Sequence, residues 1–308
     1  MQATLTRPTE TATKAEPRQK PRRRRRWRTA GVTAATVLVI IWSVAPFLWL
    51  IRSSLSPVGE MTRIPPAWWP ETVTFDNYVD LLVALFAPGD GTTTVQLIAL
   101  GLQNSMIVCV AVTVLNVVLG FSAAYGFSRS KSRLWSAALN GLIVSRMVPT
   151  FAIIIPLFLV FSHLEIYDSF AGLVLAELAV TLPFSVWLMK SYLDTIDVEL
   201  DEQARVDGAS KPQVLRKVML PAARPGVATA AIFTFLTSWN SFIFPLVLSS
   251  SPTVMTVQPQ IAATYSDMRA DYDVLFASTV LACVPPMILA FILQRQLTQG
   301  LLSGSMKG

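Results

Sequence analysis

The sequence has little of the chemistry on which most enzymes and metal proteins depend. Its 308 residues include one histidine, His163, and two cysteines, Cys109 and Cys283, which lie in separate apolar runs. A single imidazole excludes sites built on paired histidines, and two isolated thiols provide neither a disulfide framework nor a zinc ligand set. We therefore expect no metal site, no bound cofactor and no catalytic residues in this chain.

The lack of a phosphate-binding motif and the low content of charged residues further restrict the class of protein. No GxxxxGK[ST] pattern occurs, so the chain lacks the loop that holds ATP phosphates in P-loop proteins. Only 14% of the residues are charged, 53% are hydrophobic, and the mean hydropathy is +0.52. A soluble domain carries about 25% charged residues. The composition therefore predicts a membrane protein.

Basic residues are concentrated at the N-terminus. Residues 1–28 hold ten Lys and Arg against two Glu, whereas the remainder holds fifteen against seventeen acidic residues. A nucleic-acid binder needs basic residues on a folded face, so we expect no nucleic-acid partner. We expect residues 1–28 to form a disordered cytoplasmic tail whose arginine run, residues 22–26, orients the first span and contacts anionic membrane lipid.

Six apolar stretches are each long enough, at 1.5 Å per residue, to cross a bilayer core about 30 Å thick. They cover residues 29–51, 105–127, 134–161, 169–193, 225–248 and 274–293. We expect an all-α membrane protein with a first span and an external loop in residues 29–99. A five-helix core should follow in residues 100–295, and a C-terminal tail in residues 296–308.

The distribution of Lys and Arg orients these spans. With the N-terminus in the cytoplasm, twenty-one of these residues lie on the cytoplasmic side, three lie on external loops, and Arg146 lies within a span. Because positive residues are retained inside, this distribution predicts a multi-pass protein with both termini cytoplasmic.

The connection between the fourth and fifth spans, residues 194–224, is charged and too long for a simple turn. Residues 198–206 are good helix formers, which Asp207-Gly208 interrupts. Ser210 and Gln213 have the spacing of a capping box that starts a second short helix, and Pro221 should end that helix. The pattern predicts two short helices joined by a glycine turn.

This connection contains the octapeptide Glu202-Gln203-Ala204-Arg205-Val206-Asp207-Gly208-Ala209, followed by Leu215 and Leu220-Pro221. It resembles the EAA loop of ABC importer permeases, although that family usually has alanine where this chain has Gln203. Other segments are similar to the carbohydrate-type permeases of the maltose-permease group. They are Ile64-Pro65-Pro66, Phe75-Asp76-Asn77-Tyr78, Asn104-Ser105, Ala123-Ala124-Tyr125, Ser238-Trp239-Asn240 and Lys307-Gly308.

The resemblance implies a type I ABC importer permease fold with a cytoplasmic coupling loop that docks on an ATPase subunit. Glu202 and Ala204 would face the ATPase, Leu215 would face the permease body, and Gly208 would permit the turn. The other residues implied in the coupling loop are Gln203, Asp207, Ala209 and Pro221. The implied partners are a second, non-identical permease, two ATP-binding cassette subunits that hold ATP and Mg, and an extracytoplasmic solute-binding protein.

Polar residues within the spans are candidates for the translocation pathway, because charge at membrane depth is costly. Arg146 and Glu177 fit a salt bridge between spans, a polar lining for a hydroxyl-rich solute, or placement at the membrane interface. Trp239 and Asn240 fit either a sugar site, with an aromatic face and an amide, or packing between spans.

We therefore expect a bacterial inner-membrane permease subunit for sugars, without enzymatic activity. Another polar solute, such as a glycerophosphodiester or a phosphorylated polyol, is an alternative for which Arg146 would contact the anion. An ion-driven secondary transporter is a further alternative in which Glu177 relays a proton, although we find no internal repeat of the kind such folds often carry. A membrane-embedded enzyme would need a nucleophile, a base and an orienting group together, which the single histidine disfavours.

Overall fold

A computed structural model describes residues 22–57, 59–60, 68–87, 93–130, 132–266 and 272–305, and for residues 22–30, 266 and 293–305 it describes the backbone alone. Within these residues every regular element is a helix. The chain divides into two compact units, residues 1–49 and residues 50–308.

Helix α1 (Arg22–Ser54) accounts for the described part of the first unit and continues into the second. Its residues Gly31–Ser54 have the length and hydropathy of a membrane span, in agreement with the span predicted at 29–51. The helix begins earlier than expected, because arginine is a good helix former and the arginine run continues into the apolar stretch. Residues 22–28 are therefore helical, and the rest of the predicted tail lies outside the described residues.

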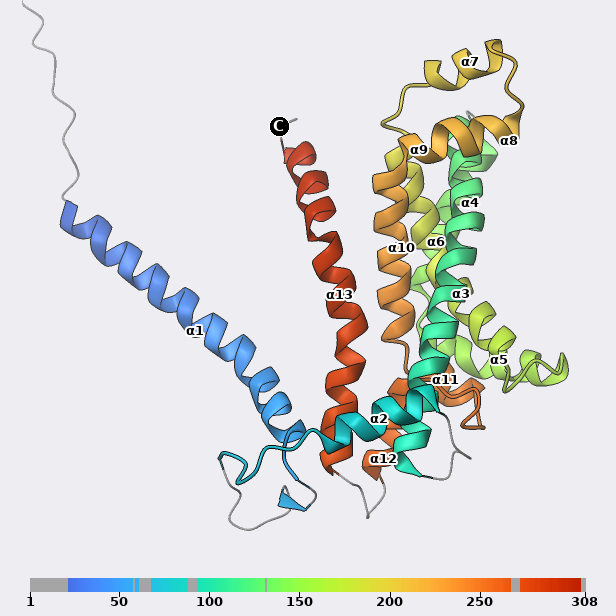
Figure 1. Cartoon of the computed structure of the whole chain (residues 1–308). Helices are drawn as coiled ribbons and strands as arrows, with labels where there is room; N and C mark the ends of the chain where they lie inside the picture. The colour runs from blue at the N-terminus through green and yellow to red at the C-terminus, as the bar shows by residue number, and fades with distance from the viewer. Residues whose placement is uncertain are drawn as a thin grey trace, which may run out of the picture. The chain divides into compact units, whose positions relative to one another are not determined.

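Three helices form the centre of the second unit: α3 (Thr94–Arg129), α6 (Phe170–Leu193) and α10 (Arg224–Trp239). They pack side by side (Figure 1). The start of α3 is fixed by a capping box between Thr93 and Gln96, and the start of α6 by the Ser169 hydroxyl, which accepts a hydrogen bond from the Gly172 amide.

Helices α2 (Asp76–Phe86), α12 (Val257–Ser266) and α13 (Tyr272–Ser305) pack against the N-terminal half of α3, and α13 also packs against both α2 and α12. Two side chains of α3 hold this arrangement. The Asn104 amide donates hydrogen bonds to the carbonyls of Pro252 and Met255, and the Ser105 hydroxyl accepts one from the Val257 amide. Helix α13 continues to Ser305, so residues 296–305 of the predicted tail are helical, while Lys307 and Gly308 lie outside the described residues.

The described residues contain four helices long and apolar enough to cross a membrane, and six spans are reached if two bent helix pairs each count as one. The third predicted span is the first such pair. Helix α4 (Arg133–Val144) and the 3-10 turn η2 (Ser145–Met147) meet α5 (Thr150–His163) at 98°. The break falls at Pro149, which favours an extended residue before it, and Val148 is extended with ψ of 123°.

The fifth predicted span, residues 225–248, is also divided. Helix α10 ends at Trp239, and a separate helix, α11 (Ile243–Leu248), follows. The 16 residues of α10 extend only about 24 Å at 1.5 Å per residue, short of a bilayer core. At its other end α10 meets residues Lys211–Ala222 at 82°, so the chain turns sharply where it leaves the charged connection.

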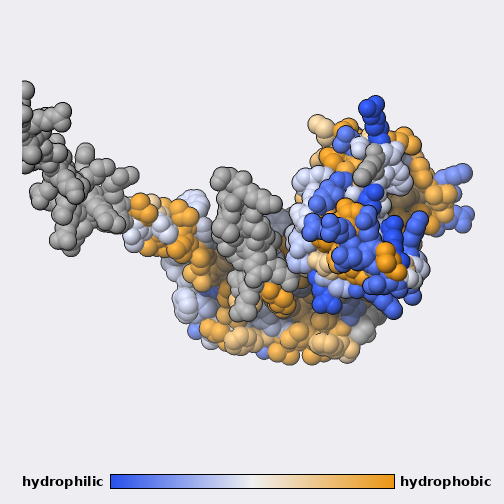
Figure 2. Space-filling view, turned by 90° about the horizontal axis from the view of Figure 1, so that it is seen from above, coloured by the Kyte–Doolittle hydropathy of each residue, from blue (hydrophilic) through white to orange (hydrophobic). Residues whose placement is uncertain are grey.

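A buried apolar cluster joins this connection to the ends of the central helices. We call it the loop cluster. Its buried members are Phe121, Ala124, Leu139, Val186, Met189, Leu193, Val214, Met219, Ala223 and Ala230. Figure 2 views the protein from the end that carries residues 194–224. Hydrophilic residues gather over this segment, with hydrophobic residues around them.

Candidate functional site

The first half of residues 194–224 is helix α7 (Glu199–Val206), an amphipathic helix with one face on the protein and one face in solvent. Its first turn carries Glu199, Asp201 and Glu202 and its last turn carries Arg205, which is the charge order that a helix dipole favours. Leu200 and Ala204 pack against the loop cluster. The opposite face forms a shallow solvent-facing hollow lined by Glu199, Glu202, Gln203, Val206 and Asp207.

Ala204 lies on the opposite face from the one expected. It was predicted to point outward with Glu202, but it is half-buried against the loop cluster, whereas Glu202 and Gln203 are exposed. The reason is helical geometry: Leu200 and Ala204 are four residues apart and share one face, and the leucine fixes that face inward. Leu215 packs against the same cluster from the second half of the connection.

Gly208 ends α7 in a left-handed backbone conformation, with φ of +85°. Its amide donates to the Arg205 carbonyl, and the Ala209 amide donates to the Ala204 carbonyl, both at 3.0 Å. This pair of bonds is the Schellman motif, with glycine at the left-handed position. Ala204 and Ala209, which flank the turn, both pack against the loop cluster. A Cβ atom at Gly208 would meet nothing within 4 Å, so the requirement for glycine comes from the backbone angle and not from crowding.

The second half begins with the predicted capping box, in which the Ser210 amide donates to Gln213 Oε1 at 2.7 Å. Helix α8 (Lys211–Gln213), the π-helical turn η3 (Val214–Met219) and helix α9 (Leu220–Ala222) then follow without interruption. Pro221 therefore lies inside this segment and does not end it. Its missing N–H is tolerated because backbone pairing changes there from the π-helical to the α-helical pattern.

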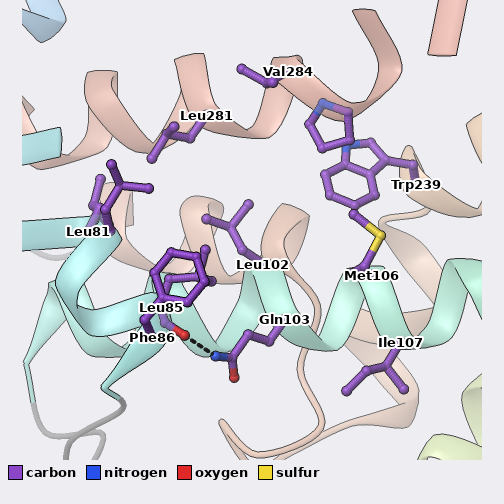
Figure 3. Close-up of a pocket in the computed structure, with 12 residues that line it drawn as sticks. Leu81, Leu85, Phe86, Leu102, Gln103, Met106, Ile107, Trp239, Leu281 and Val284 are labelled. Atoms are coloured by element: carbon purple, nitrogen blue, oxygen red, sulfur yellow. Dashed lines mark hydrogen bonds between the residues drawn. The ribbon is translucent and has the colours of Figure 1, made fainter. Parts of the chain in front are cut away.

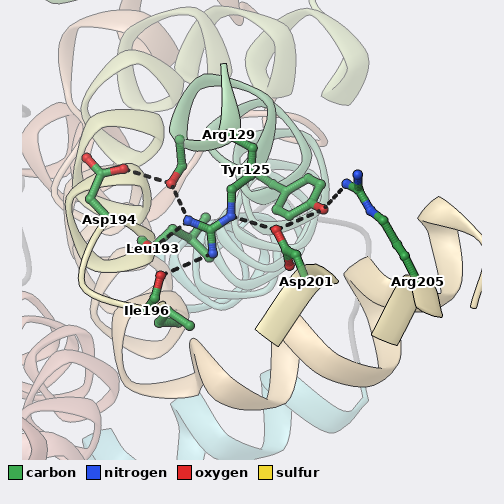
Figure 4. Close-up of polar contacts among 8 residues, drawn as sticks. Tyr125, Arg129, Leu193, Asp194, Ile196, Asp201 and Arg205 are labelled. Atoms are coloured by element: carbon green, nitrogen blue, oxygen red, sulfur yellow. Dashed lines mark hydrogen bonds and ion pairs between the residues drawn. The ribbon is translucent and has the colours of Figure 1, made fainter. Parts of the chain in front are cut away.

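A polar network ties α7 to the ends of α3 and α6 (Figure 4). Arg129 Nε on α3 donates to Asp201 Oδ2 on α7 at 2.6 Å, and its other nitrogens donate to the carbonyls of Leu193 and Ile196. Tyr125 donates to Asp201 at 3.3 Å and accepts from Arg205 at 3.4 Å. From the sequence, Arg129 had only indicated membrane orientation, because a contact between distant helices leaves no local pattern.

Arg146 and Glu177 do not pair, so the salt bridge between spans is wrong. The exposed Arg146 guanidinium donates to the Val180 carbonyl at 3.0 Å and lies 5.6 Å and 5.9 Å from the ring centroids of Phe184 and Phe233. These rings and this carbonyl take the place of a carboxylate partner. Glu177, which is 2% exposed, faces α10 and accepts a hydrogen bond from the Ser238 hydroxyl.

Glu177 belongs to a row of buried polar contacts along α6. Thr181 accepts from the Asn116 amide on α3 at 2.9 Å, and the hydroxyls of Ser185 and Thr234 lie 3.1 Å apart. Residues 177, 181 and 185 recur every fourth position, so they share one helix face. The row joins α6 to α3 and α10 inside this subunit, as polar side chains do between membrane helices.

Trp239 and Asn240 both bond to backbone carbonyls. The Trp239 indole is 2% exposed, donates to the Ala282 carbonyl on α13 at 2.9 Å and stacks on Phe235. Asn240 is exposed and donates to the Leu236 carbonyl at 2.7 Å, at the end of its own helix. These contacts favour the packing interpretation for Trp239. The indole also borders an apolar cavity of about 530 Å³ between α2, α3 and α13 (Figure 3).

At the opposite end of the unit from α7, Asp168 joins two turns. Its carboxylate accepts hydrogen bonds from the amides of Ser250 and Ser251 at 2.8 and 3.1 Å, and its own amide donates to the Leu248 carbonyl. Burial alone would raise the pKa of Asp168, but the hydrogen bonds from the two serines outweigh it and hold the pKa below its usual value.

Within the part of the chain that the structure describes, no group of three His, Cys, Asp or Glu residues could hold a metal ion.

Comparison with known proteins identifies the class to which this architecture belongs. Residues 116–303 match the family described as binding-protein-dependent transport system inner membrane component. The chain belongs to this family. It is therefore a multi-pass inner-membrane permease of the type that works with a binding protein, and the predicted family, fold class and absence of enzymatic activity are confirmed.

Individual relatives cover most of the permease. The trehalose transport system permease protein SugB of Mycobacterium tuberculosis is 30% identical over 273 residues, which are 88% of this chain and 95% of that protein. The diacetylchitobiose uptake system permease protein NgcG of Streptomyces coelicolor is 30% identical over 279 residues, 88% of this chain and 87% of its own length.

A solved structure has the same fold. A chain in the crystal structure of a bacterial ABC transporter involved in the import of the acidic polysaccharide alginate matches with a TM-score of 0.74 at 21% identity, over 91% of this permease and 99% of that chain. The arrangement of helices described above is therefore shared with a chain of that transporter.

Proposed function

We propose that this permease is the membrane subunit of an ATP-driven importer of sugars, with residues 194–224 as its coupling loop. The observation that carries the proposal is the construction of α7. Its inner face packs on the loop cluster, its end is fixed by the Schellman turn at Gly208, and its outer face offers exposed Glu202, Gln203 and Val206. A rigid helix with an exposed face suits docking on a partner, and the chain itself has no phosphate-binding loop.

The coupling loop connects directly to two helices of the central bundle. It follows α6 and precedes α10, and it meets α10 at 82°. A force applied to α7 by an ATPase dimer as it closes on ATP would therefore reach both helices and rock the permease between two states. In this proposal two ATPase subunits hold the ATP and Mg, and the loop and both termini lie in the cytoplasm.

We base the remaining partners of the proposed importer on the resemblance to ABC importer permeases. One permease supplies half of a pathway, and we propose a second, non-identical permease as the other half. An extracytoplasmic solute-binding protein would dock on the opposite end, where Asp168 and Glu165 lie in the turn before α6.

Sugars are the solute class that the relatives favour, because those named above transport trehalose and diacetylchitobiose. A second candidate is an anionic solute, such as a glycerophosphodiester, a phosphorylated polyol or an acidic sugar. The exposed guanidinium of Arg146 favours it, and a further relative, 27% identical, is a sulfoquinovosyl glycerol permease from Agrobacterium fabrum.

Purification of a tagged copy from detergent-solubilised native membranes tests the proposal. Wild type should bring down an ATPase, a second permease and a binding protein whose bound solute identifies the substrate. Gly208→Ala should lose the ATPase, because alanine is strained at φ of +85°. Gly141→Ala is the matched control, since its Cβ also meets nothing within 4 Å but it lies in helix α4. Recovery of wild-type chain alone, in membranes that still transport, would overturn the proposal.

A further inference from the structure

Helix α7 has a third attachment besides its two connections along the chain. The sequence links it to α6 through residues 194–198 and to α10 through residues 207–223. The contact between Arg129 and Asp201 links it to α3, which is distant in sequence and packs against both α6 and α10. Figure 4 shows the side chains of this attachment converging from the three helix ends.

The attachment to α3 has two points, one helical turn apart on each helix. Arg129 and Tyr125 are four residues apart on α3, and Asp201 and Arg205 are four residues apart on α7. Arg129 bonds to Asp201, Tyr125 bonds to both Asp201 and Arg205, and the distances are 2.6, 3.3 and 3.4 Å. Two contacts a turn apart prevent α7 from pivoting about one of them.

The central contact is shielded from water. The side chains of Arg129 and Asp201 are 12% and 3% exposed. Among the described residues, Asp201 Oδ1 has no hydrogen-bond partner, so this carboxylate depends on the Arg129 and Tyr125 bonds to its other oxygen. A buried charge with so few partners strongly favours the geometry in which they are made.

Arg129 also bonds to the end of α6, at the carbonyls of Leu193 and Ile196. One guanidinium therefore holds the last turn of α3, the exit from α6 and the first turn of α7 in one rigid unit. The guanidinium presents several N–H donors in one plane and can therefore bond to three helix ends at once, whereas the ammonium of a lysine lacks this planar set of donors.

We infer that Arg129, Asp201 and Tyr125 are positioning residues that make α3 move with α7, so that motion of the coupling loop reaches α3 directly as well as through α6 and α10. The inference rests on the proposed function. It specifies the residues through which ATP-driven motion of α7 would reach α3, the longest helix of the central bundle.

The test is amide hydrogen exchange of the purified complex, with and without Mg-AMP-PNP, which needs no knowledge of the solute. Nucleotide should change exchange both in α7 and in the last turns of α3 in wild type. Asp201→Ala and Arg129→Ala should keep the change in α7 and reduce the change in α3 to the part that arrives through α6 and α10. Tyr125→Phe, which removes only a hydroxyl, should reduce it.

Lys190→Ala is the matched control. Lys190 and Asp194 also form an ion pair of 2.6 Å near this end. Asp194 accepts a hydrogen bond from Ser128 on α3, so this pair belongs to an attachment between α6 and α3 that does not include α7. The α3 response of Lys190→Ala should equal that of wild type.

Three results decide the matter. An unaltered α3 response in both Asp201→Ala and Tyr125→Phe would overturn the inference and leave the importer intact. An equal loss in Lys190→Ala would also overturn it, since any disturbance of this end would then suffice. No nucleotide response in α7 of wild type would instead contradict the proposed function.

Discussion

A Cβ atom added to Gly226, in the first turn of α10, would lie 2.6 Å from Cγ and 2.7 Å from Cβ of Tyr192, in the last turn of α6. The two helices touch at the point where the chain leaves and returns from the coupling loop. Because the Tyr192 Cβ is fixed to its own backbone, the clash cannot be relieved by rotating the ring. Close approach at Gly226 therefore sets the distance between the two helices that carry the loop.

Gly226→Ala should destabilise the permease, because the start of α10 must move away from α6. Overpacking of this kind costs about 1–3 kcal/mol. Alanine otherwise favours a helix over glycine by about 1 kcal/mol. Thermal unfolding of the purified complex should therefore show a lower midpoint for Gly226→Ala and an unchanged or higher one for Gly126→Ala, where a Cβ meets nothing within 4 Å. Equal midpoints for the two variants would contradict this account of the helix spacing.

The contact between Glu177 and Ser238 predicts a graded response to substitution. Glu177→Gln keeps an oxygen that accepts from the Ser238 hydroxyl and should be well tolerated. Glu177→Ala leaves that hydroxyl buried without its acceptor, at a cost of about 1–3 kcal/mol, and adds a cavity. The unfolding midpoint should fall in the order wild type, Gln, Ala. A glutamine variant as unstable as the alanine variant would show that more than this hydrogen bond is lost.

Asp168 predicts a dependence of stability on pH. Its folded pKa lies below its usual value, so its contribution is present above the unfolded pKa of about 3.9 and is lost as the pH falls through the folded pKa. Asp168→Asn is the matched variant, because asparagine also tolerates the φ of 53° found there.

The difference in unfolding free energy between wild type and Asp168→Asn should be constant near neutral pH and should shrink on acidification below about pH 4. Chemical unfolding followed by tryptophan fluorescence between pH 3 and pH 7 measures this. If the difference in unfolding free energy between wild type and Asp168→Asn stays the same down to pH 3, the amides of Ser250 and Ser251 do not bind the ionised carboxylate more strongly than the neutral one.

Features that depend on neighbouring residues could be predicted from the sequence, whereas contacts between distant helices could not. Helix α7, the turn at Gly208 and the capping box at Ser210 could be predicted, because each depends on residues within one or two turns of the chain. The break at Pro149 was visible as a proline, but whether a membrane helix bends or divides there depends on the helices beside it.

Side-chain partners were the least predictable feature. Arg146 and Glu177 were the obvious ionic pair by composition, yet each bonds elsewhere, because Phe184 and Ser238 occupy the neighbouring faces. Arg129 and Asp201 do pair, across 72 positions of the chain, and nothing local distinguishes them from other charged residues. Such pairs follow from how α3 packs on α6, which only the structure defines.

Substitution of Trp239 distinguishes a role in helix packing from a role in solute binding. Its indole N–H is donated to the Ala282 carbonyl, and its ring stacks on Phe235. Trp239→Phe keeps an aromatic ring but leaves a buried carbonyl without that donor, so stability should fall by about 1–2 kcal/mol. The solute concentration for half-maximal transport should be unchanged. Trp187→Phe, at a more exposed tryptophan on α6, is the control and should leave both quantities as in wild type. A side chain that binds solute without stabilising the helix bundle would affect transport alone. If Trp239→Phe raises the solute concentration for half-maximal transport and leaves stability unchanged, Trp239 is therefore a solute contact.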